Sequence, residues 1–186
     1  MERTDGLDEY RAVVARVEAF AAVVSARRSA DLQCRAGCDS CCHVELEVSP
    51  VEAAAVRAHL RSLDEAEVAG LAARARDRQG GRCVMLDAAG RCSIYDARPL
   101  VCRTQGLPLR YPAGFVPSEA IGLHLGEKGD ATWCPLNFRE RKPAGEDVLD
   151  AELVDRLLAV VNQRFSTSTG QEALERVSLR LLAGGA

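Results

Sequence analysis

Apolar and polar residues follow a helical period in several parts of the chain. Over residues 7–30, apolar side chains recur every three or four positions, and charged side chains fall between them. The same period returns over residues 150–165. Thr169 and Glu172 then have the spacing of a capping box, which predicts one more helix start. We therefore expect an amphipathic helix near the beginning of the chain and C-terminal helices over about 150–183.

An alternating pattern leads into a second helix start in the first third of the chain. Residues 44–49 alternate between apolar and polar side chains, as a short strand with one buried face does. Ser49 and Pro50 follow in the order typical of a helix N-terminus, and Glu52 completes a capping box with the serine. We expect a short strand that leads directly into a helix over about 50–61.

The next helix signal begins one residue after that helix. Ser62 and Glu65 repeat the capping pattern, and a Gly-Gly pair at 80–81 provides a stop. The pattern predicts a helix over about 63–78, packed against the preceding helix as a hairpin.

The middle of the chain reads as short elements separated by turns. Two β-prone runs flank residues 87–90, which predicts a β-hairpin with Gly90 at positive φ. Asp96 is placed to cap a short helix that carries Cys102. Residues 106–148 contain five of the seven prolines and little periodicity, so we expect irregular structure with short extended pieces.

Composition narrows the fold class. The chain of 186 residues is 47% hydrophobic and only 4% aromatic, and its apolar residues are mostly Ala, Val and Leu. Such a core favours helix packing over broad aromatic-rich sheets. We predict one compact domain over residues 1–186, mainly α with a small β-hairpin, organised around a cysteine metal site. The motif core of that domain spans about 34–103.

Charge and hydropathy argue against two classes of partner. The 24 Lys and Arg residues against 27 Asp and Glu residues give a net charge of −3, and no basic run stands out for nucleic-acid binding. Neither a signal peptide nor an eighteen-residue apolar run is evident. We expect a cytoplasmic protein that binds neither nucleic acid nor membrane, with an unknown protein or small-molecule partner.

Eight cysteines carry the candidate chemistry. A reducing cytosol opposes disulfides in a chain of this length, so metal binding is the favoured explanation. In the stretch "CRAGCDSCCH", three thiolates of one tight loop can face a common point, as loops that bind zinc or an iron–sulfur cluster do. The candidate ligands are Cys34, Cys38, Cys41, Cys42, Cys83, Cys92, Cys102 and Cys134.

The adjacent pair Cys41 and Cys42 bears on the number of metal sites. In an extended segment, neighbouring side chains point to opposite sides and do not easily share one ion. We therefore expect either two adjoining sites or a multinuclear cluster. His43 follows directly and is weighed as a further ligand, although a hydrogen-bonded structural histidine is the commoner case. The spacing of Cys34, Cys38 and Cys41 also equals that of the cysteine triad in radical S-adenosylmethionine enzymes. Ser40, however, stands where those enzymes usually have an aromatic residue.

The segments "CRAGCDSCC" and "CVMLDAAGRCSIYDARPLVCR" together resemble the bacterial YkgJ-type cysteine-cluster family of zinc- or iron-chelating domain proteins. The resemblance covers residues 34–103 and implies metal ligation by every cysteine from Cys34 to Cys102. Arg98 and Arg103 fit the same motif and could donate hydrogen bonds to sulfur. Flagellin lysine methylases share a related cluster, but no methyltransferase signature accompanies it here. Cys134 lies outside the motif.

These observations predict a metal-binding cysteine-cluster protein that holds zinc, iron or an iron–sulfur cluster through thiolates. Redox or cluster-assisted chemistry is one interpretation. The alternative is a zinc-stabilised structural or protein-interaction module without catalysis. No Ser-His-Asp set, paired acid–base carboxylates or phosphate loop marks an independent active site, so the sequence assigns no catalytic residue and leaves open whether the protein is an enzyme.

Overall fold

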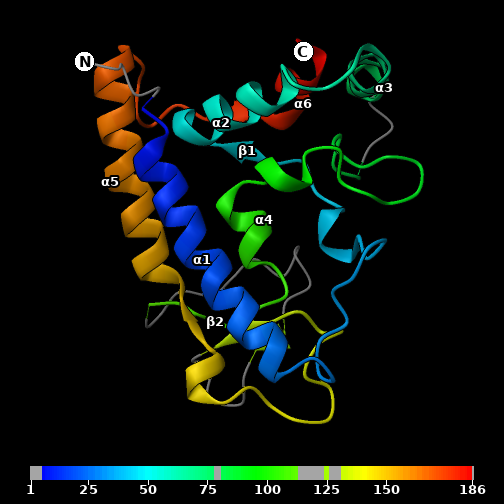
Figure 1. Ribbon diagram of the computed structural model, residues 1–186, viewed down its shortest axis with the longest axis vertical. Helices are drawn as coiled ribbons and strands as arrows, with labels where there is room; N and C mark the ends of the chain where they lie inside the picture. The colour runs from blue at the N-terminus through cyan, green and yellow to red at the C-terminus, as the bar shows by residue number, and fades with distance from the viewer. Residues whose placement is uncertain (1–5, 78–80, 113–123, 126–130, 186) are drawn as a thin grey trace.

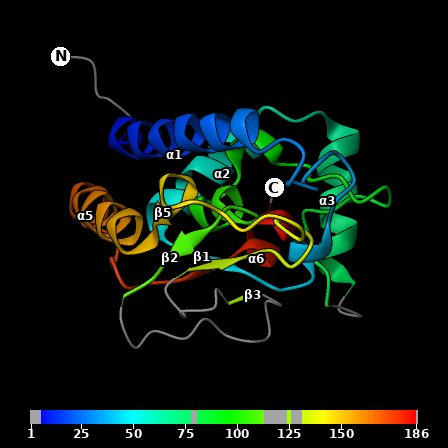
Figure 2. The same ribbon diagram turned by 90° about the horizontal axis from the view of Figure 1, so that it is seen from below.

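The computed structural model describes residues 6–77, 81–112, 124–125 and 131–185. About half of the chain is helical, and the sheets are small, which confirms the predicted helical class. The cysteine-bearing loops lie together on the side of the molecule away from helix α5 (Figures 1 and 2). None of the helices in the described segments has the length and apolar content needed to cross a membrane.

Two long helices form one wall of the molecule. Helix α1 (Asp8–Arg27) lies beside α5 (Ala151–Thr169) in both views (Figures 1 and 2). Their apolar stripes meet in a buried cluster that includes Val13, Val17 and Phe165, as the helical period predicts. Burial of these stripes is what fixes both helices, because isolated helices are only marginally stable in water.

The predicted helix start at Thr169 is wrong. Thr169 is the last residue of α5, and its hydroxyl donates to the Phe165 carbonyl at 2.9 Å within that helix. Gly170 follows with φ +71°, the left-handed conformation that closes a helix C-terminus. The last helix, α6 (Leu179–Gly184), begins only after a short strand.

Helix α2 (Pro50–Leu60) begins as predicted. The Glu52 carboxylate accepts hydrogen bonds from the backbone N–H of Ser49 at 3.1 Å and from its hydroxyl at 2.8 Å. Glu52 is only 4% exposed, so its carboxylate is held inside the protein by these donors.

Helix α3 (Glu65–Arg76) differs from its prediction in start and in packing. Asp64 and Glu67 form the capping box, because the Ser62 hydroxyl donates to the His59 carbonyl instead. The helix packs mainly against α6 and forms no hairpin with α2. In Figure 1, α2 runs across the view, whereas α3 is seen end-on.

Within the described segments, each strand is two residues long. Strand β1 (Glu47–Val48) pairs antiparallel with β6 (Val177–Ser178). The second sheet has the order β3-β4-β2-β5, from β3 (His124–Leu125), β4 (Thr132–Trp133), β2 (Leu109–Arg110) and β5 (Leu149–Asp150). Short extended pieces in this region were predicted, but their assembly into a sheet was not.

The predicted hairpin is reduced to a tight turn. Leu86 and Cys92 form a single antiparallel bridge, and the Ser93 N–H donates to the Met85 carbonyl at 2.8 Å. Gly90 has φ +74°, as its place in the turn predicts. Leu86, and not Cys83, therefore lies opposite Cys92, and the two cysteines are joined by a turn in place of two regular strands.

The short helix α4 (Leu100–Thr104) carries Cys102, but its N-cap is Pro99. Asp96, the predicted cap, lies in the separate 3₁₀ turn Tyr95–Ala97. Because Pro99 fixes its own backbone, the helix starts immediately after it and needs no Asp96 side chain.

Candidate metal centre

The loop that carries the first four cysteines is built from two consecutive turns. The Cys38 N–H donates to the Arg35 carbonyl at 2.9 Å, and Gly37 between them has φ +85°. The Cys42 N–H then donates to the Asp39 carbonyl at 2.8 Å, which opens a 3₁₀ turn over Ser40–Cys42. These turns fold the loop back on itself.

Cys41 and Cys42 do not point to opposite sides as expected. Their sulfur atoms lie 4.0 Å apart, because the two residues sit in a 3₁₀ turn and not in an extended segment. The contact lowers the pKa of Cys41 through the hydrogen bond from the Cys42 thiol, and it raises the pKa of Cys42. The pair therefore favours one proton and one thiolate.

The turn that carries Cys83 and Cys92 docks onto this loop. The Cys83 N–H donates to the Cys42 carbonyl at 2.7 Å. An exposed ion pair joins the Arg82 guanidinium to the Asp39 carboxylate at 2.7 Å. These contacts bring two cysteine pairs together from segments forty residues apart in the sequence.

Helix α4 brings Cys102 to the same place. The Leu100 N–H donates to the Glu52 carboxylate at 3.0 Å, so Glu52 binds the N-terminal turns of both α2 and α4. The Leu100 side chain is 2% exposed and packs in the core with Val51. Cys102 is thus anchored to the helical body more firmly than the loop cysteines are.

A cavity of about 750 Å³ lies where these segments meet. Six of the eight cysteines line it: Cys38, Cys41, Cys42, Cys83, Cys92 and Cys102. The rest of its wall combines apolar side chains such as Met85 and Ile94 with Arg35, Arg91 and Arg98.

Cys34 and Cys134 meet beside the cavity through Asn137. The Asn137 side-chain amide accepts from the Gln33 N–H at 2.8 Å and donates to the Cys34 sulfur at 3.3 Å. The Asn137 N–H donates to the Cys134 carbonyl at 2.9 Å, so both residues belong to one tight turn. The sequence gives no signal for Asn137, because nothing in its neighbourhood indicates a contact with a cysteine a hundred residues earlier.

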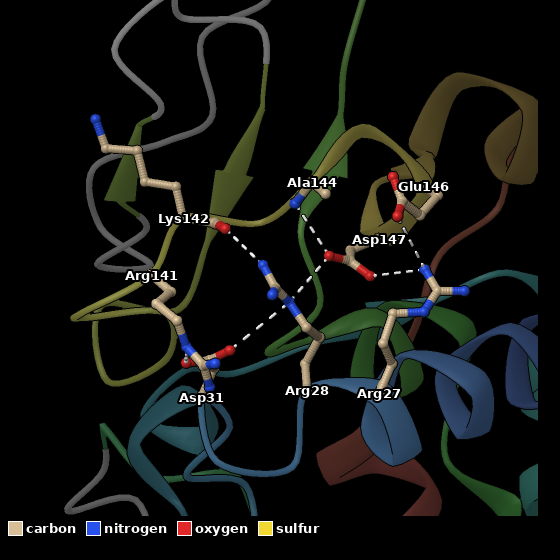
Figure 3. Close-up of polar contacts among 8 residues, drawn as sticks. All are labelled: Arg27, Arg28, Asp31, Arg141, Lys142, Ala144, Glu146 and Asp147. Carbon is tan, nitrogen blue, oxygen red and sulfur yellow. Dashed lines mark hydrogen bonds and ion pairs between the residues drawn. The ribbon is translucent and has the colours of Figure 1, made fainter.

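An ion-pair network joins residues just before Cys34 to residues after Cys134 (Figure 3). Asp147 is completely buried and contacts Arg27 at 3.1 Å and Arg28 at 3.0 Å. Asp31 contacts Arg141 at 3.0 Å. The network ties the end of α1, just before Cys34, to the segment that follows Cys134.

The structure gives different positions to the three residues that the sequence suggested as a further ligand or as hydrogen-bond donors to sulfur. His43 lies 3.6 Å from the Asp39 carboxylate and does not line the cavity. Arg98 lines the cavity and stacks over the Tyr95 ring, with its charge also lowering the pKa of Cys41. Arg103 donates to the Arg98 carbonyl and pairs with Glu18, so it holds the α4 turn and not a sulfur atom.

Burial raises the pKa of five thiols: Cys34, Cys83, Cys92, Cys102 and Cys134. Burial raises the pKa of Cys102 to about 12, and the neighbouring Cys83 and Cys92 thiolates add to the effect. In the metal-free chain these groups are neutral at physiological pH, so a metal ion must displace their protons.

The donor set fits zinc, iron or an iron–sulfur cluster. All eight cysteines are free thiols, and thiolate is the ligand that these centres share. A Cβ on Gly106 would lie 2.5 Å from the Cys34 sulfur, so the chain leaves room for that sulfur by having glycine there. Among the described residues, no three His, Cys, Asp or Glu side chains are already grouped closely enough to hold a metal ion.

Residues 33–116 match the family model CxxCxxCC, described as "Putative zinc- or iron-chelating domain". The match includes every cysteine from Cys34 to Cys102 and ends before Cys134. The chain has three residues between its first two cysteines, one more than the family name indicates. No curated protein and no solved structure matches the chain.

Proposed function

We propose, from the premise that residues 33–116 belong to the CxxCxxCC family, that this protein chelates zinc or iron through cysteine thiolates. The observation that carries the proposal is the convergence of six cysteines on one cavity. They come from three segments: the loop around Cys38, the turn around Cys83 and helix α4. Free thiols gathered from distant segments are the usual ligand set of thiolate metal centres.

The bound metal would also connect segments that have little regular structure. The loop and the turn contact each other through the Cys83–Cys42 backbone hydrogen bond and the exposed Asp39–Arg82 ion pair. Because metal binding adds its free energy to that of folding, ligation would lock these segments onto α4. This supports a stabilising role for the metal whether or not it is also a reactive centre.

A second role is redox or cluster-assisted chemistry with a small molecule. The size and mixed walls of the cavity favour it, since about 750 Å³ lies within the usual range of small-molecule pockets. Apolar side chains cover much of the wall, and Arg35 and Arg98 would favour an anionic group on the ligand. The thiolates would hold an iron–sulfur cluster, and the chemistry that such a cluster would supply there is one-electron transfer.

Anaerobic purification of the full chain, followed by zinc, iron and acid-labile sulfide analysis, tests both roles. Zinc alone supports the chelating role and the non-catalytic alternative of an interaction module. Iron with sulfide, and a visible colour that dithionite bleaches reversibly, supports the redox role. Free thiols with no bound zinc, iron or sulfide, and no uptake of added Zn²⁺ or Fe²⁺, would overturn the proposal.

A further inference from the structure

We infer that Asn137, which lies outside the family segment 33–116, positions Cys34 as a metal ligand by donating a side-chain N–H to the cysteine sulfur. The inference rests on the proposed metal-chelating function and goes beyond it, because it names a residue that binds no metal itself. Asn137 is then a positioning residue, and the metal centre depends on the chain around residue 137 as well as on residues 33–116.

Two backbone groups fix the orientation of the Asn137 amide. Its Oδ1 accepts from the Gln33 N–H at 2.8 Å, and its Nδ2 donates to the Gly106 carbonyl at 2.8 Å. A flipped amide would place a donor against a donor and an acceptor against an acceptor, so the nitrogen must face Gly106. The amide nitrogen carries two hydrogens, and the second one donates to the Cys34 sulfur at 3.3 Å.

The Cys34 sulfur is also confined from the side of helix α4. Gly106 follows that helix with φ +91°, and a Cβ built on it would lie 2.5 Å from the Cys34 sulfur and 3.3 Å from Asn137 Nδ2. Only glycine fits there, because a side chain would displace both atoms and the positive φ disfavours other residues. The sulfur therefore touches the Gly106 backbone and the Asn137 amide, which hold it in place although Cys34 is otherwise exposed.

The turn that carries Asn137 is anchored to the body without the help of any cysteine side chain. The Phe138 N–H donates to the Asp31 carbonyl at 2.8 Å, and the buried Phe138 ring packs edge-on against Trp133. Phe138 has φ +53°, a left-handed conformation that residues other than glycine rarely adopt. Such strain persists only where the surrounding contacts hold it, and here the two neighbouring side chains, Asn137 and Phe138, are both buried.

The ion-pair network of Figure 3 holds the same turn. The carboxylate of Asp31, whose carbonyl binds Phe138, pairs with Arg141 at 3.0 Å. The Arg28 guanidinium lies 5.8 Å from the centre of the Phe138 ring and pairs with the buried Asp147. The amide is thus positioned before any metal binds, as a residue that orients a ligand must be.

Asn162 provides a comparison within the same protein. Like Asn137, it is buried and joins two distant backbone groups, accepting from the Val51 N–H at 3.1 Å and donating to the Ala173 carbonyl at 2.7 Å. The difference between the two residues is the sulfur atom. Asn137 donates its second N–H to Cys34, whereas Asn162 lies on α5, away from the cysteine-bearing loops.

A hydrogen bond from this amide serves Cys34 as a ligand in two ways. The sulfur of a metal-bound thiolate carries negative charge, so it accepts an N–H more strongly than a neutral thiol does. The contact also keeps the side chain in one rotamer, so less conformational freedom is lost when the metal binds. Both effects make the metal complex more stable than it would be with an unrestrained Cys34 side chain.

The test measures Zn²⁺ affinity of the full-length chain, stripped of metal and reloaded under reducing anaerobic conditions, by competition with a chelator. Asn137→Ala should weaken zinc binding about 10- to 100-fold, because Cys34 loses the donor that holds its sulfur. The matched control Asn162→Ala removes a buried asparagine of the helical body. It should lower the urea midpoint of the metal-free protein and bind zinc as the wild type does.

Cys34→Ser supplies the background that separates positioning from general stability. It removes the ligand through which Asn137 acts, so it should itself weaken zinc binding. Adding Asn137→Ala to this variant should then change the affinity little further, because the two residues act as one unit. An Asn137 side chain that only supports the fold predicts the opposite, the same fold-change in both backgrounds.

Asn137→Asp tests the donor alone. Aspartate keeps the size of the side chain and the oxygen that accepts from Gln33, but it puts a second oxygen where the amide nitrogen faces Cys34 and Gly106. We expect zinc binding at least as weak as in Asn137→Ala, with helical content by circular dichroism close to that of the wild type. If Asn137→Ala does not fold, this variant decides the question.

The other outcomes also have definite meanings. Wild-type affinity in Asn137→Ala or Asn137→Asp would overturn the inference, as would an equal loss of affinity in Asn162→Ala. Wild-type affinity in Cys34→Ser would show that Cys34 is not a ligand, which overturns the inference and leaves chelation by the other cysteines intact. A wild-type chain that takes up neither Zn²⁺ nor Fe²⁺ would overturn the proposed function itself.

Discussion

The helical body and the cysteine region are held together by different forces. The body comprises α1, α2, α3, α5 and α6, and residues such as Val51, Val56 and Leu71 have no exposed surface there. The cysteine region comprises residues 33–46 and 81–104, and Cys34 and Cys41 in it are exposed. Outside the short helix α4, its segments have few regular backbone hydrogen bonds.

This difference suggests that hydrophobic burial stabilises one region and metal ligation the other. Hydrophobic burial, worth about 25 cal/mol per Å² of apolar surface, stabilises the body through the three buried clusters, and Val84, Met85 and Ile94 anchor the turn that follows residue 81 in one of them. Residues 33–46 contain no buried side chain and offer polar contacts and thiols instead, so the order of this loop should depend on metal. Changes in the body should therefore affect stability with or without metal, and changes in the cysteine region should affect mainly the metal-loaded protein.

The largest effect should come from pH acting on the cysteine region. Burial holds the pKa of Cys34, Cys83, Cys92, Cys102 and Cys134 above the ordinary thiol value, so zinc must displace protons to bind. Apparent zinc affinity should rise with pH, by up to about tenfold per pH unit for each proton released. Competition with a chelator between pH 6 and 8 measures the slope, and a pH-independent affinity would rule out thiol ligation.

The next largest effect is expected from a substitution in the core of the helical body. Leu71 on α3 is fully buried, so Leu71→Ala should lower the free energy of unfolding by about 2–5 kcal/mol. Urea unfolding should give the same loss for metal-free and zinc-loaded protein. Leu174→Ala is the matched control, since that leucine is 93% exposed and its removal should change little. A loss confined to the zinc-loaded form would contradict the separation of the two regions.

Glu52 connects the two regions and should have an intermediate effect. Its carboxylate accepts from Ser49 at the start of α2 and from Leu100 at the start of α4, so Glu52→Gln puts an amide N–H₂ against these donors. We expect a loss of about 1–3 kcal/mol in stability, because hydrogen bonds to a buried charged acceptor are lost.

The same substitution should also weaken zinc binding at the site that contains Cys102, which α4 positions. Glu65→Gln, on the exposed surface of α3, is the matched control and should leave both quantities unchanged. Unaltered unfolding of Glu52→Gln would show that Glu52 is not needed to hold α4.

Local patterns were enough to predict most helices of the body, but not the residues at which α3 and α6 begin. The helical periods and the Ser49–Glu52 box predicted α1, α2 and most of α5, because each signal lies within one turn of the residues it fixes. The start of α3 was misplaced because Ser62 and Asp64 both fit a capping box. The choice depends on the Ser62 hydroxyl, which bonds back to His59.

The small sheet and the placement of Cys134 beside Cys34 depend on contacts between distant segments. Strands of two residues, such as Leu109–Arg110, are too short for an alternating pattern to be recognised. The cysteine spacing indicated metal ligation, with either two adjoining sites or a multinuclear cluster. The position of Cys134 was not predictable, because it depends on Asn137 reaching Cys34 across the fold.

The smallest effect should appear at the edge of the cysteine region. The Arg82 guanidinium lowers the pKa of the exposed Asp39 by hydrogen bonding, so this pair contributes only while Asp39 is ionised and is lost as pH falls through that lowered value. Exposed ion pairs contribute little to global stability, and Arg82→Ala should leave the urea midpoint unchanged. The same substitution should speed hydrogen exchange of the Cys83 amide, which donates to the Cys42 carbonyl, in the metal-free protein alone. Zinc-loaded protein should exchange at the wild-type rate, because thiolate ligation then holds the turn. Faster exchange in both forms would mean that the ion pair, and not the metal, orders this turn.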